Sequence, residues 1–242
     1  MPVLLLSSML AVTARGADRQ VAAFAVERCA GNPIIRPGMP GLLPERGVDN
    51  INGPSLIRVP DWIEKPLGRY YLYFAHHNGS HIRLAYAEAI EGPWQIHAGG
   101  VLPLSQTPGR SHVASPDVHV DHELRRIRMY FHAPAPKDSP MKGQLTWAAL
   151  SADGLDFQVN QEVLGQFYMR VFERQGVFYG LAKNHNDGGI LYRSADGLTG
   201  FETGPRILPR VRHLALWYDR ANDVLYVFLS RGEDNPDRKS VV

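Results

Sequence analysis

The sequence has a single cysteine, Cys29, among its 242 residues. One cysteine cannot form an intrachain disulfide, and it excludes a zinc site built on several cysteines. We expect Cys29 to be a small buried hydrophobic side chain rather than a reactive thiol. The sequence also lacks a basic block, because its 26 basic and 24 acidic residues are mixed along the chain. Nucleic acid is therefore not expected as a partner.

Long hydrophobic runs are absent as well. The apolar stretch at residues 2–12 is too short to span a bilayer, and no other stretch reaches spanning length, so no membrane partner is expected. Small residues follow it at Ala14 and Gly16, as a signal peptidase requires, but no lysine or arginine precedes Arg15. The segment is either an export signal, which would make the protein secreted or periplasmic, or a first strand, or the result of a misassigned start.

Helical periodicity of any length is missing, and short aromatic-rich stretches recur instead. Their tyrosine, phenylalanine, valine and leucine side chains favour β-strands. They group into four units that repeat about every 50 residues along the chain. The expected strands are residues 53–59, 69–75 and 82–87; 115–120, 126–131 and 144–149; 167–172, 176–181 and 189–194; and 212–217 and 224–229.

Two of these units close on the same five residues, Ser-Ala-Asp-Gly-Leu, at 151–155 and 194–198. A repeat of this length with three or four strands per unit predicts propeller blades, with a β-sandwich as the structural alternative. We expect an all-β, five-bladed β-propeller that is incomplete, with about four blades present in this chain. The domains would be an N-terminal segment at 1–29 and a propeller at 30–242 that is cut short at the C-terminus.

Four short motifs carry a resemblance to a known group of proteins. They are Asn-Pro-Ile-Ile-Arg-Pro at 32–37, Tyr-Leu-Tyr-Phe-Ala-His-His at 71–77, Glu-Gly-Pro-Trp at 91–94 and Ser-Pro-Asp-Val-His-Val at 115–120. In this order the chain resembles the five-bladed propeller glycoside hydrolases, which include the family 43 arabinanases and xylosidases, the levansucrases and the invertases. The resemblance covers about residues 30–235.

That resemblance implies three acidic positions at the starts of successive inner strands: a base aspartate, a pKa-tuning aspartate and an acid glutamate. Asp117 matches the second position. The first position reads Asn52-Gly53-Pro54, and Asp49 lies just upstream as a substitute base. The third position reads 167–170 without a glutamate. Some propeller glycosidases that act on agar oligosaccharides use histidine as the acid, which makes His185 and His213 the candidates here.

Strand direction predicts where a site would lie. In an antiparallel blade the start of the first strand and the end of the second lie at one rim. Six of the ten histidines fall there, beside arginine and asparagine, which suit the hydroxyls of a sugar. The candidate ligand-binding residues are Asn52, His76, His77, His112, His132, Tyr168, Arg170, Asn184, Arg212 and Arg231.

The sequence therefore predicts a glycoside hydrolase-like protein whose polar funnel accepts an oligosaccharide or polysaccharide. The alternative is a carbohydrate-binding propeller that has lost the acid glutamate and does not catalyse. A protein-binding scaffold is a third reading, for which large exposed apolar patches would be expected. No cofactor and no metal ligands are assigned, although the rim histidines leave an axial metal ion open.

Overall fold

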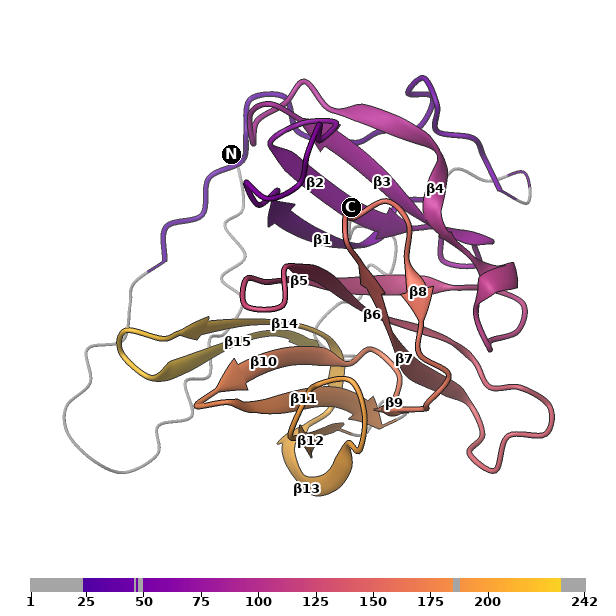
Figure 1. The fold of residues 1–242 in the computed structure, drawn as a ribbon, viewed down its shortest axis with the longest axis vertical. Helices are drawn as coiled ribbons and strands as arrows, with labels where there is room; N and C mark the ends of the chain where they lie inside the picture. Colours follow the sequence, from indigo (N-terminus) through magenta and orange to yellow (C-terminus); the bar gives the residue numbers. More distant parts are fainter. Residues whose placement is uncertain (1–23, 46, 48–49, 185–187, 232–242) are drawn as a thin grey trace.

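The computed structural model describes residues 24–45, 47, 50–184 and 188–231. These residues form fifteen β-strands and one short 3-10 turn, and they contain no α-helix. The described residues contain no helix that is long and apolar enough to span a membrane. The strands form four antiparallel sheets, which confirms the predicted all-β class (Figure 1).

Each sheet is built from strands that follow one another along the chain. The first sheet has the order β1-β2-β3-β4, the second β5-β6-β7-β8 with β9 also paired to β7, the third β10-β11-β12-β13, and the fourth β14-β15. The strands are β1 (Asn52–Arg58), β2 (Tyr70–Ala75), β3 (His81–Ala87), β4 (Gln95–Pro103), β5 (Ala114–Asp121), β6 (Arg126–Pro134), β7 (Gln144–Ser151), β8 (Gln158–Val159), β9 (Gly165–Gln166), β10 (Arg170–Arg174), β11 (Val177–Asn184), β12 (Gly188–Ser194), β13 (Glu202–Pro209), β14 (Val211–Asp219) and β15 (Val224–Arg231).

All eleven strands expected from the repeat are present, with one clear shift. The third unit begins its first strand at Arg170 rather than at residue 167, because Tyr168 has a left-handed backbone with φ 61°. The outer strands β4, β8 and β13 carried no recognisable pattern. Strand β13 shows why. Seven of its eight residues are exposed, so burial does not impose an alternation of apolar and polar side chains along it.

The sheets pack face to face in the order of the chain. Alternate residues of the middle strands point to opposite neighbours. On β6, Met129 joins the core shared with the first sheet, whereas Tyr130 joins the core shared with the third. On β11, Ala182 belongs to the core with the second sheet and Leu181 to the core with the fourth. This two-sided burial explains the unbroken apolar runs of these strands.

The two Ser-Ala-Asp-Gly-Leu turns connect the second sheet to the first and the third sheet to the second. In each turn the serine and aspartate side chains accept hydrogen bonds from backbone N–H groups that follow them. The glycine carbonyl then accepts a buried tyrosine hydroxyl from the preceding sheet. Tyr73 of β2 donates to Gly154 O at 3.0 Å, and Tyr130 of β6 donates to Gly197 O at 2.7 Å.

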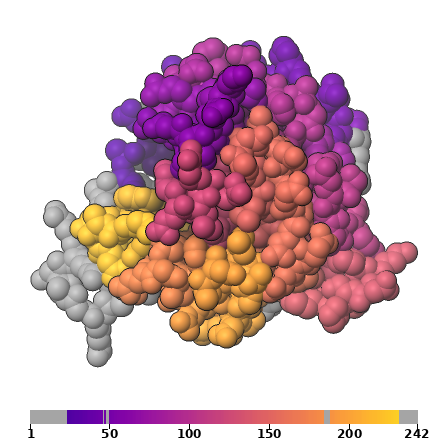
Figure 2. Space-filling view, viewed as in Figure 1, coloured from indigo at the N-terminus to yellow at the C-terminus, as the bar shows by residue number. Residues whose placement is uncertain are grey.

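The sheets run in chain order around the molecule, from the indigo and magenta first sheet through orange to the yellow β14–β15 (Figure 2). The described N-terminal segment returns to that last sheet. Phe24 packs edge-on against Trp217, Tyr226 and Phe228, with ring centroids 5.1–5.6 Å apart. Cys29 of this segment is exposed, so the prediction of a buried cysteine is wrong. The residues around it form no strand and enclose no core.

Candidate functional site

The strand register confirms that first-strand starts and second-strand ends share one rim. Asn52 of β1 pairs with Ala75 of β2, and Ala114 of β5 pairs with His132 of β6. In the last sheet Val211 of β14 pairs with Arg231 of β15. In each of these three sheets the start of the first strand therefore lies beside the end of the second, as the antiparallel argument requires.

The first strands are irregular at this rim. The register of β1 shifts between Asn52 and Ser55, that of β5 between Ala114 and Asp117, and that of β14 between Val211 and His213. Bulges of this kind turn a side chain out of the regular alternation. Left-handed residues accompany them: Gly53 has φ 58° and Ser115 has φ 51°. The rim side chains are thus aimed by local backbone geometry.

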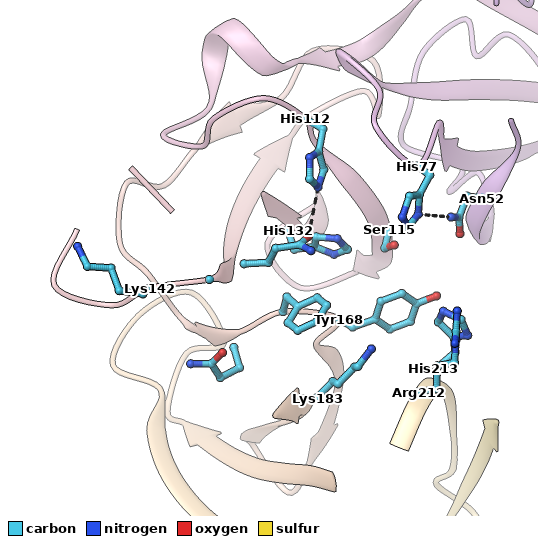
Figure 3. A pocket seen from close by; sticks show the side chains of 14 residues that line it. Asn52, His77, His112, Ser115, His132, Lys142, Tyr168, Lys183, Arg212 and His213 are labelled. Carbon is cyan, nitrogen blue, oxygen red and sulfur yellow. Dashed lines mark hydrogen bonds between the residues drawn. The ribbon is translucent and has the colours of Figure 1, made fainter. Parts of the chain in front are cut away.

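A cavity of about 470 Å³ opens at this rim (Figure 3). Residues from all four sheets and the segments beside them line it. They are Asn52, His77, His112, Ser115, His132, Lys142, Gly143, Gln144, Gln166, Phe167, Tyr168, Lys183, Arg212 and His213.

Hydrogen bonds hold several of these polar side chains in place. The Asn52 amide nitrogen lies 3.0 Å from Nδ1 of His77, and Nε2 of His112 lies 3.2 Å from Oε1 of Gln144 (Figure 3). Nδ1 of His213 lies 3.3 Å from Oγ of Ser230. Each contact joins one strand or loop to a different one, so the cavity offers donors and acceptors that are fixed before a ligand arrives.

Aromatic rings form one wall of the cavity. The Tyr168 ring lies 5.0 Å from the His213 ring and 5.9 Å from the His132 ring. The Arg170 guanidinium lies 5.0 Å from the centre of the Tyr168 ring. Phe167 continues the wall, 5.6 Å from His132. Tyr168 is therefore a supported flat surface, and its left-handed backbone separates it from strand β10.

Two of the cavity histidines, His132 and His213, have a lowered pKa. Burial, with the nearby His112, Arg170, His77 and Lys183, lowers the pKa of His132 to about 3. Burial, with Arg212 and Lys183 close by, lowers the pKa of His213 to about 4. At neutral pH both imidazoles are uncharged, which suits hydrogen bonding better than proton donation.

Asp117 lies below the cavity and does not line it. Its carboxylate binds His119 Nε2 at 2.9 Å and the Val171 N–H at 2.8 Å, and lies 3.7 Å from Arg170 Nη1. Burial raises the pKa of Asp117, but His119, Arg170 and the Val171 N–H outweigh that effect and hold it below its usual range. Asp117 is thus an ionised strut between β5 and β10 that reaches the cavity through Arg170.

The structure brings together seven of the predicted residues around the cavity: Asn52, His77, His112, His132, Tyr168, Arg212 and His213. Arg170 lies beneath it, because its guanidinium donates to the carbonyls of Pro116 and Leu214. His76 is buried and turned into its own loop, where Nδ1 accepts the Asn78 N–H. Asp49 and His185 lie outside the described residues, as do the side chains of Asn184 and Arg231.

Sequence reasoning missed Lys183, Phe167, Gln144, Gln166 and Lys142. Lys183 carried a usable signal, because it lies just after the expected strand at 176–181 and directly before the candidate residue Asn184. Gln144 and Gln166 lie at the start of β7 and the end of β9, and the role of these strand ends was not considered. Among the described residues, no three histidine, cysteine, aspartate or glutamate side chains form a metal-binding group.

Known proteins resemble this chain in sequence or in fold. No family model matches the sequence. The uncharacterized protein R118 of Acanthamoeba polyphaga mimivirus is 31% identical over 223 residues, which cover 78% of this chain and 60% of that protein. The chain thus spans about 60% of the length of this curated relative.

Solved structures share the fold at low sequence identity. A family 117 glycoside hydrolase of Zobellia galactanivorans has a TM-score of 0.53 at 19% identity, over 74% of this chain and 53% of that one. The endo-1,5-α-L-arabinanase of Thermotoga petrophila gives 0.53 at 18%, over 76% and 48%. The exo-β-1,3-galactanase of Phanerochaete chrysosporium gives 0.56 at 10%, over 76% and 44%. The predicted likeness to the β-propeller glycoside hydrolases is confirmed at the level of the fold.

Proposed function

We propose that this chain is a glycoside hydrolase-like protein that binds one end of an oligosaccharide or polysaccharide in the rim cavity. One observation carries the proposal. A flat, supported aromatic ring, Tyr168, stands among preset side-chain donors and acceptors such as Asn52, His77 and His112 in a cavity of about 470 Å³. Sugars need both an apolar surface for a ring face and fixed partners for hydroxyls.

The five-bladed architecture belongs to the same proposal. The structural neighbours include a galactanase and an arabinanase, which act on polysaccharides according to their names. Their likeness to this chain supports a propeller. The described residues supply four sheets, of which the last has two strands. We take these sheets as four blades of a five-bladed propeller.

Hydrolysis would need a proton donor for the glycosidic oxygen and a base or nucleophile on the other side of the scissile bond. Asp49 remains the proposed base, as predicted from the sequence. Asp117 acts indirectly, since its carboxylate fixes Arg170 and Arg170 supports Tyr168. The neutral state of His213 at pH 7 suits it to form a hydrogen bond with a sugar hydroxyl, while a role as the general acid of hydrolysis would require acidic conditions.

A second candidate function is binding without catalysis. The observation that favours it is that none of the described residues lining the cavity is an aspartate or glutamate. A cavity of this kind can still hold a sugar through aromatic and neutral polar contacts. The two candidates share the ligand and differ only in the chemistry that follows binding.

The test is a screen of oligosaccharides for binding and for release of sugar. We expect at least one to bind, and Tyr168→Ala to weaken that binding by about fivefold or more, as for loss of an aromatic anchor. Trp217→Ala is the control, because Trp217 is an exposed aromatic residue of β14 outside the cavity. Release of sugar would favour hydrolysis, and binding without release would favour the second candidate. Absence of any binding would refute both.

A further inference from the structure

The charge of the cavity is one-sided. Lys142, Lys183 and Arg212 line it together with four histidines, and no carboxylate lies among its described residues. Lys142 is already engaged, because its ammonium group donates to the carbonyls of Ser139 and Lys137 at 2.7 and 3.3 Å. The cations that matter are therefore Lys183 and Arg212.

Lys183 is held in the cavity wall by its own strand. It is the penultimate residue of β11, its side chain is buried, and its backbone N–H donates to Phe167 O at 3.1 Å. Its ammonium nitrogen lies 4.9 Å from the centre of the Phe167 ring. That contact stabilises a cation only weakly in comparison with an ion pair. In Figure 3 the side chain points into the cavity toward Tyr168.

Arg212 adds a second positive charge from a different sheet. Burial and the charge of Arg212 both lower the pKa of Lys183. Arg212 and Lys183 together depress the pKa of His213 as well. Arg212 and Lys183 therefore lie close enough to disfavour further positive charge on Lys183 and His213.

No described carboxylate relieves this charge. Neither Lys183 nor Arg212 forms an ion pair with an acidic residue in the described part of the chain. Asp117 does not line the cavity, and its carboxylate is engaged by His119, Arg170 and the Val171 N–H. Lys183 is buried and Arg212 is partly buried. A buried cation without an acidic partner is unfavourable, and a bound anion would reduce that penalty.

We propose that the saccharide recognised in this cavity carries an anionic group, a carboxylate of a uronic acid or a sulfate ester, that binds between Lys183 and Arg212 while the sugar ring lies on Tyr168. This inference rests on the proposed carbohydrate-binding function and narrows it to acidic sugars. The neutral His132 and His213 complete the site, since an imidazole can donate to an anionic oxygen without adding charge.

The experiment compares oligosaccharides that differ only in the acidic group. An array carries neutral oligosaccharides beside their uronic-acid and sulfated counterparts, and calorimetry at low ionic strength follows each hit. We expect an acidic member to bind about tenfold or more tightly than its neutral counterpart. We expect the difference in affinity between acidic and neutral oligosaccharides to decrease with added salt. Comparison of the uronic-acid and sulfated oligosaccharides then shows whether the cavity binds a carboxylate or a sulfate.

Two variants locate the preference. Lys183→Met and Arg212→Gln should each reduce binding of the acidic sugar by about tenfold while changing binding of the neutral one little. Lys137→Met is the control, since it removes one positive charge from an exposed residue outside the cavity. Lys183→Met places an unbranched side chain of similar length at this buried position, and a thermal melt tests whether the variant folds.

The outcomes separate this inference from the proposed function. Equal affinity for neutral and acidic members of every pair would overturn the anionic assignment and leave carbohydrate binding in place. No binding of any saccharide would overturn the proposed function itself. Sodium sulfate binding as tightly as a sulfated sugar would also overturn the inference, because the sugar would then contribute nothing.

Discussion

Gly53 offers a sharp test of how the cavity rim is built. Its backbone is left-handed, with φ 58°, and it lies against Ser115 of the next sheet. A Cβ atom placed on Gly53 would lie 2.9 Å from Ser115 Cα and 3.0 Å from Ser115 Oγ. The first contact involves backbone, so Gly53→Ala must move one sheet edge relative to the other.

The magnitude follows from three contributions. The left-handed conformation costs an alanine about 1–2 kcal/mol. Overpacking against a neighbour that cannot rotate away adds about 1–3 kcal/mol. The smaller entropy of the unfolded alanine chain returns about 0.4–1 kcal/mol. We therefore expect Gly53→Ala to lower the free energy of unfolding by about 2–4 kcal/mol.

Gly176→Ala is the matched control. Gly176 is also left-handed, with φ 75°, but no atom lies within 4 Å of a Cβ placed there. Only the conformational contribution remains, so the loss should be about 1 kcal/mol. Urea unfolding measures both, and Gly53→Ala should lower the midpoint by about 1 M more than Gly176→Ala. Equal losses in the two variants would refute the close approach of Gly53 to Ser115.

Three further predictions concern the polar side chains of Tyr130, Asp117 and His213. Tyr130→Phe leaves the Gly197 carbonyl without its hydroxyl donor and should destabilise the fold by about 1–3 kcal/mol, measured by urea unfolding. A change near zero would refute a stabilising role for this hydrogen bond. Asp117→Asn breaks the pairing with Arg170 and should cost about 3–5 kcal/mol at pH 7. Because the folded pKa of Asp117 is lowered, its contribution is present above the unfolded value and lost as pH falls through the folded one, so the variant and the parent should converge in acid. His213 also has a lowered pKa in the folded state, about 4, so its contribution to stability is present above pH ~6.5 and is lost as pH falls toward 4. His213→Gln should therefore reduce the slope of stability against pH in this range by at most about 1.4 kcal/mol per pH unit. An unchanged slope would contradict a neutral His213.

The middle strands were the most predictable part of the molecule. Runs such as residues 71–75 are buried on both faces, so every position is apolar and the signal is strong. The rim could also be placed, because antiparallel pairing alone decides which strand ends meet. The edge strand β13 was not predictable, since almost all of its residues face solvent.

The finer details of the site depended on backbone geometry that no residue pattern announces. Tyr168 and Ser115 are left-handed although neither is glycine, and these conformations decide where the strands begin and which side chains enter the cavity. Arg170 was predicted to bind ligand because it lies at a strand start. It instead donates to Pro116 O at 2.7 Å, a contact between residues 54 positions apart that only the folded chain reveals.

The hydrogen bonds from Tyr73 and Tyr130 to the following sheets imply an order in which the sheets become fully packed. The turn that accepts Tyr73 belongs to the sheet that follows it in the chain, and the same holds for Tyr130. During synthesis the buried tyrosine of the first or second sheet can therefore form its hydrogen bond only after the following sheet has left the ribosome. Proteolysis of ribosome-bound chains of increasing length should show β2 becoming resistant only once residues 151–155 have emerged.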